Sequence, residues 1–363
     1  MDIAKNFKPE TILLWEKVSD QPEAQRIINM FPSANVKLIE YQRLPEINMS
    51  PSEALLKSKR TLMIGHASSF VGNSNGNLGS NIHCMPYYKL VPVSNGCPYY
   101  CTYCYLAYVY RKFSPYIKIN INYDTMYKQI RKNLAHSKPN ASFNMGEMLD
   151  SLALDHITNL TTELIPFFAG LSKGYLMLLT KSSNIDNLLK VEPNHKVVVS
   201  WSLNPEYIIN QYEKGTASLE ERIEAARKCQ SKGYRIRLRI DPGIYYQDWQ
   251  NGYSELIKKT LSVIEPENIT LGMLRLLPGH FQLARNTYGK NAINLLSSEF
   301  IKGASDEKLR YRPETRINFY HFLIDTIRSF SKTVSISLCR ETSDILNIFK
   351  EHCERKKCNC LIW

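Results

Sequence analysis

The middle of the chain alternates short apolar runs with amphipathic segments. Strand-like runs lie at 88–93, 142–146, 175–180, 196–203, 235–241 and 269–276. Between them, segments such as 123–136, 219–233 and 252–264 carry apolar residues at helical spacing. The segment 219–233 ends at Gly233, and glycine commonly follows the last turn of a helix. This alternation predicts a parallel sheet curled into a barrel or partial barrel, with the chemistry at the carboxyl ends of its strands.

The two ends of the chain show different patterns. Near the N-terminus, "TILLWEKV" and "ANVKLIEY" are strand-like and "EAQRIINMF" is helix-like, and a Gly-, Ser- and Asn-rich stretch follows at 68–83. Near the C-terminus come a long helical pattern, a strand, a short helix and the tail "CERKKCNCLIW". We therefore expect an α/β protein in three parts: a small N-terminal α/β unit (1–85), a partial (β/α)6 TIM-like barrel (86–303) and a C-terminal extension (304–363).

Composition narrows the class of protein. The 363 residues are 44% hydrophobic and 22% charged, a globular balance. No apolar run reaches the roughly 18 residues of a membrane span, and no secretory signal pattern is present. Nine cysteines, an odd number, indicate cytoplasmic thiols or metal ligands and not a disulfide framework. We expect a cytoplasmic protein without a membrane partner.

The charge adds a candidate partner. The net charge of +12 favours polyanions, above all nucleic acid, although a basic protein without such a partner fits it equally well. Aromatic and basic residues interleave in "YLAYVYRKFSPYIK" (105–118). That mixture suits bases and phosphates, and it also suits a buried aromatic segment between barrel elements.

The stretch "CPYYCTYC" carries the clearest chemistry. Cys97, Cys101 and Cys104 form a C-x3-C-x2-C pattern just after the first barrel strand. Three thiolates on one short loop can bind three irons of a 4Fe–4S cubane and leave the fourth iron open. An open iron can chelate S-adenosylmethionine, whose reductive cleavage releases a 5′-deoxyadenosyl radical. Zinc is the alternative, since structural zinc takes four ligands and Cys84 or His83 could supply the fourth.

This motif is similar to that of the radical S-adenosylmethionine superfamily, and the strand–helix order is similar to its partial (β/α)6 barrel. More narrowly, the chain resembles the spore photoproduct lyase-like family. The matching segments run in the same order: "FKP" (7–9), "CTYCYL" (101–106), "LLTK" (178–181), "WSLNPEYII" (201–209), "KGTASLEERIEAARKCQSKGY" (214–234) and "IDPGIYYQDWQNGY" (240–253). The resemblance covers most of the chain and is weakest toward the C-terminus.

The resemblance implies an enzyme that cleaves S-adenosylmethionine at a 4Fe–4S cluster, with an electron donor such as flavodoxin or ferredoxin. Repair of a DNA photolesion is the reaction it suggests. Radical modification of another substrate, a nucleoside, RNA or a peptide, is an alternative. A zinc-stabilised nucleic-acid-binding protein is the alternative from another class.

Further site residues are implied by the same resemblance. Tyr103 and Tyr105 match two tyrosines that are implicated in radical relay in the lyase, and packing or stacking on a base is the other interpretation. Gly146 and Glu147 resemble the Gly–Glu motif that holds the methionyl amine. Asp150 follows as a polar candidate for the same pocket.

Two more predicted ligands lie at the ends of neighbouring predicted strands. Lys181 matches a lysine that binds the S-adenosylmethionine carboxylate, and Ser202 is a similarly placed polar candidate. Arg235, Arg237 and Arg239 lie on one face of a predicted strand. If that face lines the barrel mouth, Arg239 can bind a carboxylate or a phosphate; if it faces outward, the arginines are solvated.

One feature departs from the family. The lyase has a cysteine in the segment around Glu147 that returns a hydrogen atom to the substrate, whereas residues 105–228 of this chain contain no cysteine. The tail carries Cys358 and Cys360. They could bind a second metal with another C-terminal cysteine, one could supply the missing hydrogen atom, or the tail could be disordered.

Overall fold

The computed structural model describes residues 2–42, 49–76, 81–82, 84–110, 116–293, 299–303, 306–353, 358 and 360–361. Residues 111–115 of the predicted aromatic and basic segment lie outside them. No helix in these ranges is both long and apolar enough to cross a bilayer.

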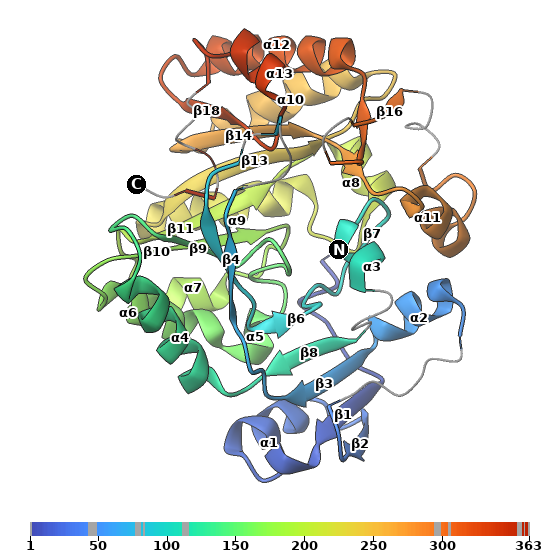
Figure 1. Ribbon diagram of the computed structural model, residues 1–363, viewed down its shortest axis with the longest axis vertical. Coiled ribbons are helices and arrows are strands. Elements are labelled where there is room, and N and C mark those ends of the chain that lie inside the picture. Colours follow the sequence, from blue (N-terminus) through green and yellow to red (C-terminus); the bar gives the residue numbers. More distant parts are fainter. Residues whose placement is uncertain are drawn as a thin grey trace.

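The larger sheet occupies the middle of the molecule (Figure 1). In spatial order it contains β4 (Val71–Ser74), β5 (Tyr87–Leu90), β9 (Ser142–Asn144), β10 (Tyr175–Thr180), β11 (Val197–Ser202), β13 (Arg235–Gly243), β14 (Asn268–Met273) and β18 (Ser335–Leu338). All neighbours pair in parallel except β4 and β5. Within the described residues β4 and β18 do not pair with each other, so the sheet is open. The predicted partial barrel is confirmed, with β18 of the C-terminal extension as a seventh parallel strand.

Helices follow the strands and cover one face of this sheet. They are α4 (Tyr123–Ala135), α5 (Asp155–Thr158), α6 (Leu160–Ala169), α7 (Asp186–Lys190), α8 (Glu206–Tyr212), α9 (Leu219–Lys232), α10 (Trp249–Leu261), α12 (Pro313–Phe330) and α13 (Ser343–Ile348). Helix α9 begins with a capping box between Ser218 and Glu221 and ends at Gly233, whose φ of 106° favours glycine. The predicted end of this helix is therefore confirmed.

The two faces of the sheet differ in polarity because side chains alternate along each strand. On β13, Ile236, Leu238 and Ile240 join the main apolar core under the helices. Arg237 and Arg239 alternate with them and therefore point to the opposite, inner face. The inner face is polar elsewhere too; it also carries Asn144, Ser200, Ser202, Thr270 and Ser337.

A second sheet forms the N-terminal end of the molecule (Figure 1). Its strands are β2 (Asn35–Ile39), β1 (Thr11–Trp15), β3 (Thr61–Gly65), β8 (Ile117–Asn120) and β6 (Val93–Ser94), with α1 (Pro22–Asn29), α2 (Pro51–Ser58) and the short 3-10 helix η1 (Glu16–Val18) beside them. The sequence analysis missed α2 and β3, because short apolar runs carry little periodicity. β6 and β8 come from beyond residue 85, so this sheet draws on both sides of the predicted boundary; the division into three parts stays a prediction.

Smaller elements complete the fold near the carboxyl ends of the barrel strands. A two-stranded ladder joins β7 (Tyr100–Cys101) to β12 (Glu213–Lys214), and β15 (Arg275–Leu276), β17 (Leu309–Tyr311) and β16 (Phe300–Lys302) form an antiparallel sheet. Two further helices are α3 (Tyr105–Tyr110) and α11 (His280–Tyr288). The β7–β12 ladder matters most for the site, because it fastens the cysteine loop to the barrel.

Candidate active site

A cavity of about 260 Å³ opens where the carboxyl ends of the barrel strands meet the cysteine loop. Parallel strands place all their carboxyl ends at one edge, which explains why residues far apart in sequence meet here. All the predicted site residues line this one cavity: Cys97, Cys101, Cys104, Tyr103, Tyr105, Glu147, Asp150, Lys181, Ser202 and Arg239.

The cysteine loop is held by backbone contacts. Cys101 pairs with Glu213 across the β7–β12 ladder. The N–H of Cys104 donates to the carbonyl of Cys101 at 3.0 Å, which closes a tight turn. The ammonium of Lys59 donates to the carbonyl of Cys97. The loop therefore presents its thiols from a fixed backbone.

The three thiols suit a cluster with one open iron. None of them forms a disulfide. Burial raises the pKa of Cys97 to about 12 and that of Cys101 well above its ordinary value, so both are uncharged until a metal displaces their protons. In the described ranges no group of three His, Cys, Asp or Glu side chains is arranged to hold a single ion. A cubane asks for a different iron at each cysteine, so this set of donors fits it.

Glu213, which the sequence analysis missed, lies at the centre of the hydrogen-bond network of the site. Its buried carboxylate accepts hydrogen bonds from Lys181 (2.9 Å), Asn204 (2.9 Å), Arg222 (2.6 Å) and the hydroxyl of Tyr103. Burial alone would raise the pKa of Glu213, but the charges of Arg222 and Lys181 outweigh it and hold the pKa well below its usual range. Nothing in the local sequence marks Glu213, because its partners come from separate elements.

The two predicted relay tyrosines have different surroundings. Tyr103 is 7% exposed, and its hydroxyl is bound to Glu213. Burial and the neighbouring carboxylate raise the pKa of Tyr103 well above its ordinary value, so the phenol keeps its proton. Tyr105 is 43% exposed at the start of α3, and the ammonium of Lys308 lies 5.9 Å from its ring centre. Both tyrosines line the cavity, but only Tyr103 is enclosed.

Two predicted ligands of S-adenosylmethionine contact each other. The ammonium of Lys181, at the end of β10, donates to the hydroxyl of Ser202 at 2.7 Å as well as to Glu213. The ammonium is thus fixed in place by two oxygen atoms at the edge of the cavity. A cation held in this way is available to a carboxylate without a large loss of side-chain freedom.

Asp150 lines the cavity, but protein donors occupy its carboxylate. One oxygen accepts from the N–H groups of Leu152 (3.1 Å) and Ala153 (3.0 Å) and from the hydroxyl of Thr180 (2.7 Å). The other accepts from the N–H of Lys181 at 2.8 Å. Burial raises the pKa of Asp150 despite these bonds. The contacts join the loop after β9 to the end of β10, which indicates a positioning role.

Glu147 faces arginines on the far wall of the cavity. Its carboxylate accepts from Arg340 at 3.0 Å and lies 3.7 Å from Arg239. Burial alone would raise the pKa of Glu147, but the charges of Arg340 and Arg239 outweigh burial and lower the pKa. The carboxylate therefore stays ionised. Gly146 precedes it where the chain runs against β10: a Cβ there would lie 2.2 Å from Cβ of Leu179.

We expect Gly146→Ala to destabilise the protein by about 1–3 kcal/mol, because the new methyl group overpacks against Leu179. Urea denaturation of the cluster-free protein measures this loss. Gly170→Ala is the matched control: its Cβ would meet nothing closer than 3.7 Å, and its φ of −76° suits alanine. Equal stability of the two variants would contradict the close approach at Gly146.

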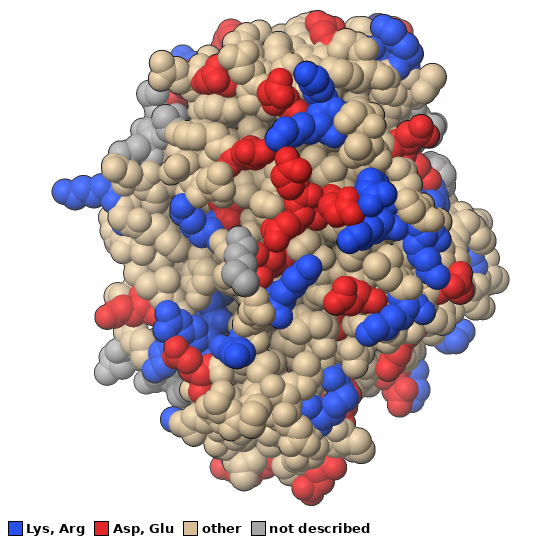
Figure 2. All heavy atoms as spheres, turned by 180° about the vertical axis from the view of Figure 1, so that it is seen from behind, with Lys and Arg blue, Asp and Glu red and all other residues tan. Residues whose placement is uncertain are grey.

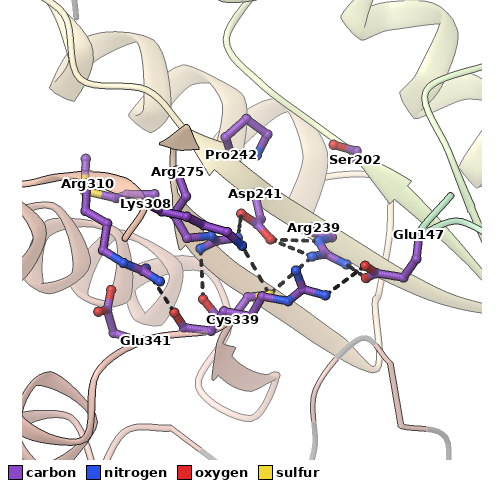
Figure 3. A network of polar contacts seen from close by, with 12 residues as sticks. Glu147, Ser202, Arg239, Asp241, Pro242, Arg275, Lys308, Arg310, Cys339 and Glu341 are labelled. Atoms are coloured by element: carbon purple, nitrogen blue, oxygen red, sulfur yellow. Dashed lines mark hydrogen bonds and ion pairs between the residues drawn. The ribbon is translucent and has the colours of Figure 1, made fainter. Parts of the chain in front are cut away.

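Basic side chains and their acidic partners form part of the cavity lining. Figure 3 shows Asp241 between Arg239 (2.6 Å) and Arg275 (2.7 Å), with Cys339 beside them. Lys308 and Arg340 also line the cavity. Nη1 of Arg239 is buried and has no hydrogen-bond partner within the described residues. Of the three predicted arginines, Arg239 lines the cavity, where this nitrogen faces the carboxylate of Glu147 at 3.7 Å.

Comparison with known proteins identifies the family. The family model described as "Spore photoproduct lyase" matches residues 7–312. The chain is 25% identical over 307 residues to a spore photoproduct lyase from Geobacillus sp. (strain Y412MC61), covering 83% of this chain and 85% of the relative. It is 27% identical over 255 residues to a lyase from Clostridium acetobutylicum, covering 68% and 72%.

A solved structure shares the fold. Spore photoproduct lyase complexed with dinucleoside spore photoproduct superimposes with a TM-score of 0.79 at 22% identity, covering 92% of this chain and 99% of that chain. The family match replaces the zinc-binding interpretation of the cysteines. The chain belongs to the spore photoproduct lyase family, and it is a radical S-adenosylmethionine enzyme that works with a 4Fe–4S cluster and S-adenosylmethionine.

Proposed function

We propose that this enzyme repairs the spore photoproduct in DNA. The observation that carries the proposal is the cavity itself, whose lining combines the three cysteines of the loop with the basic side chains Arg239, Arg275, Lys308 and Arg340. Such a lining suits a phosphate-bearing substrate. The relatives named above act on this lesion by name, and one was solved with its dinucleoside form.

In this proposal the cysteine loop and the strand ends share the work. When bound, the cluster and S-adenosylmethionine supply a 5′-deoxyadenosyl radical that removes a hydrogen atom from the substrate. Lys181, fixed by Ser202 and Glu213, binds the methionyl carboxylate. Glu147 is the candidate for the amine. Tyr103 relays the radical, and Glu213 can take the phenol proton when the ring is oxidised.

The net charge of +12 favours a nucleic acid as the macromolecular partner. We propose DNA as the macromolecular partner, a flavodoxin or ferredoxin as electron donor, and the cytoplasm as the location. Figure 2 shows acidic and basic side chains side by side over the face it presents, so no single basic patch dominates there. The basic side chains of the cavity lining are the candidates for contact with the DNA backbone.

Anaerobic reconstitution with the dinucleotide spore photoproduct tests the function. We expect formation of 5′-deoxyadenosine and release of the repaired thymidine dinucleotide, and undamaged thymidine dinucleotide as control should give no product. Cleavage of S-adenosylmethionine without repair would contradict the proposal. It would instead favour radical modification of a nucleoside, RNA or peptide.

A further inference from the structure

The C-terminal tail lies across the inner face of the barrel sheet. Nη1 of Arg237, on β13, donates to the carbonyls of Cys358 at 2.9 Å and Leu361 at 2.5 Å. The amide of Asn144, on β9, contacts the sulfur of Cys360 at 3.3 Å. β10 and β11 lie between β9 and β13, so the described tail residues are tied to two strands of the sheet that are not neighbours. Cys360 and Leu361 are only 6% and 2% exposed.

These contacts explain the polar inner face. Arg237 is 3% exposed, and a buried guanidinium needs oxygen partners. It finds two of them in the tail carbonyls on either side of Cys360. Because one arginine holds both flanks, the position of the thiol between them is set by the sheet.

The thiol of Cys360 lies directly behind the cavity wall. Its sulfur is 3.7 Å from a carboxylate oxygen of Glu147, which lines the cavity. Cys360 itself does not line the cavity, since Glu147 stands between, held there by Arg340 and Arg239. A substrate phosphate that pairs with these two arginines would release Glu147 and open the path to the thiol.

We infer that Cys360 is the hydrogen-atom donor that completes the reaction. The inference rests on the proposed function, in which opening of the lesion leaves a carbon radical on the substrate. A thiol S–H bond is much weaker than the O–H bond of an alcohol and about as weak as that of a phenol, so a thiol can supply the atom. The cysteines of the loop are committed to the cluster, and the hydroxyl of Tyr103 is bound to Glu213.

The step balances in atoms and electrons. The S–H bond of Cys360 breaks homolytically, a C–H bond forms on the substrate, and a thiyl radical remains on the sulfur. One electron from a low-potential donor, the class that also reduces the cluster, and one proton from water restore the thiol. No other oxidant or reductant is needed.

The test uses the reconstituted full-length enzyme in deuterated water with the dinucleotide spore photoproduct, which keeps the phosphate between its two nucleosides. The thiol exchanges its proton with solvent, so the wild-type product should carry solvent deuterium. Cys360→Ser keeps the size and the contact with Asn144 but offers a much stronger O–H bond. We expect its 5′-deoxyadenosine formation to stay within about threefold of wild type while repaired product falls at least about tenfold and a substrate radical accumulates in electron paramagnetic resonance.

Controls separate this inference from the function on which it rests. Cys353→Ser removes another buried C-terminal thiol and should repair at the wild-type rate, whereas Cys339→Ser tests the thiol beside Arg239. Failure of wild type to repair the lesion would count against the proposed function. Normal repair and labelling by Cys360→Ser would overturn the donor assignment alone.

A second readout does not require the cluster. In cluster-free protein, inorganic phosphate that pairs with Arg239 and Arg340 should release Glu147, speed alkylation of Cys360 by iodoacetamide at least about threefold, and leave the rate for Cys353 unchanged. Peptide mapping by mass spectrometry measures both rates. Equal rates for Cys360 with and without phosphate would also overturn the assignment.

Discussion

The Cys101→Ala variant should form no stable 4Fe–4S cluster and should produce no measurable 5′-deoxyadenosine. Removal of one of three thiolates leaves two cluster irons without a protein ligand, and the remaining pair cannot hold the cubane. Cys101 is also the cysteine that the β7–β12 ladder fixes opposite Glu213. Iron and sulfide analysis after anaerobic reconstitution, together with the visible absorption spectrum, measures the loss.

A matched thiol provides the control for this experiment. Cys229 is fully buried in α9 and does not line the cavity. Cys229→Ala should therefore keep about four irons per chain and normal cleavage of S-adenosylmethionine. If Cys101→Ala also retained its iron and its activity, Cys101 would not be a cluster ligand.

The second large effect concerns stability. Glu213→Leu should lower the free energy of unfolding by about 3–5 kcal/mol, because it leaves the buried guanidinium of Arg222 without its carboxylate. It also removes the acceptor of Lys181 and Tyr103, so binding of S-adenosylmethionine should weaken. Urea denaturation of the cluster-free protein measures the first effect, and calorimetric titration measures the second.

An exposed ion pair provides the control for Glu213→Leu. Glu224 pairs with Arg227 on α9, and both side chains are nearly half exposed. Glu224→Leu should change stability by less than about 1 kcal/mol, since exposed ion pairs contribute little. Comparable losses in the two variants would show that the Glu213 network does not support the fold.

The pH dependence of stability gives an independent check on Glu213. Its pKa is held well below the ordinary range, so its contribution is fully present above the unfolded-state pKa of about 4.3 and is lost as pH falls toward the folded-state value. Wild type should therefore lose stability below about pH 4 more steeply than Glu213→Leu does. Parallel acid profiles would contradict the depressed pKa.

The strands of the barrel were predictable because their signal is local. Buried parallel strands such as β10 and β11 form continuous apolar runs, and Lys181 and Ser202 simply end them. The parallel arrangement then brings those ends together, so a linear pattern was enough to group the predicted site residues. The spacing of Cys97, Cys101 and Cys104 is local in the same way, since one short loop must reach three irons.

Other features depend on contacts between distant segments. β8 adds to the N-terminal sheet and β18 extends the barrel sheet, although neither sequence shows its partner. Glu213 gains its importance only from Tyr103, Lys181 and Arg222, which reach it from other elements. Long-range pairing of this kind leaves no periodicity in the chain.

The sequence by itself determined the order of strands and helices and the spacing of the three cysteines, because each is fixed within a short segment; the resemblance to the family added the candidate ligands at the strand ends. Only the tertiary structure decided which way the arginines of β13 face and where the tail lies. Arg237 is buried and holds the tail, and Arg239 faces the cavity. Arg237 binds the carbonyls of Cys358 and Leu361, and Cys360 contacts Asn144 and Glu147; these contacts join distant segments, so they exist only when the sheet has formed.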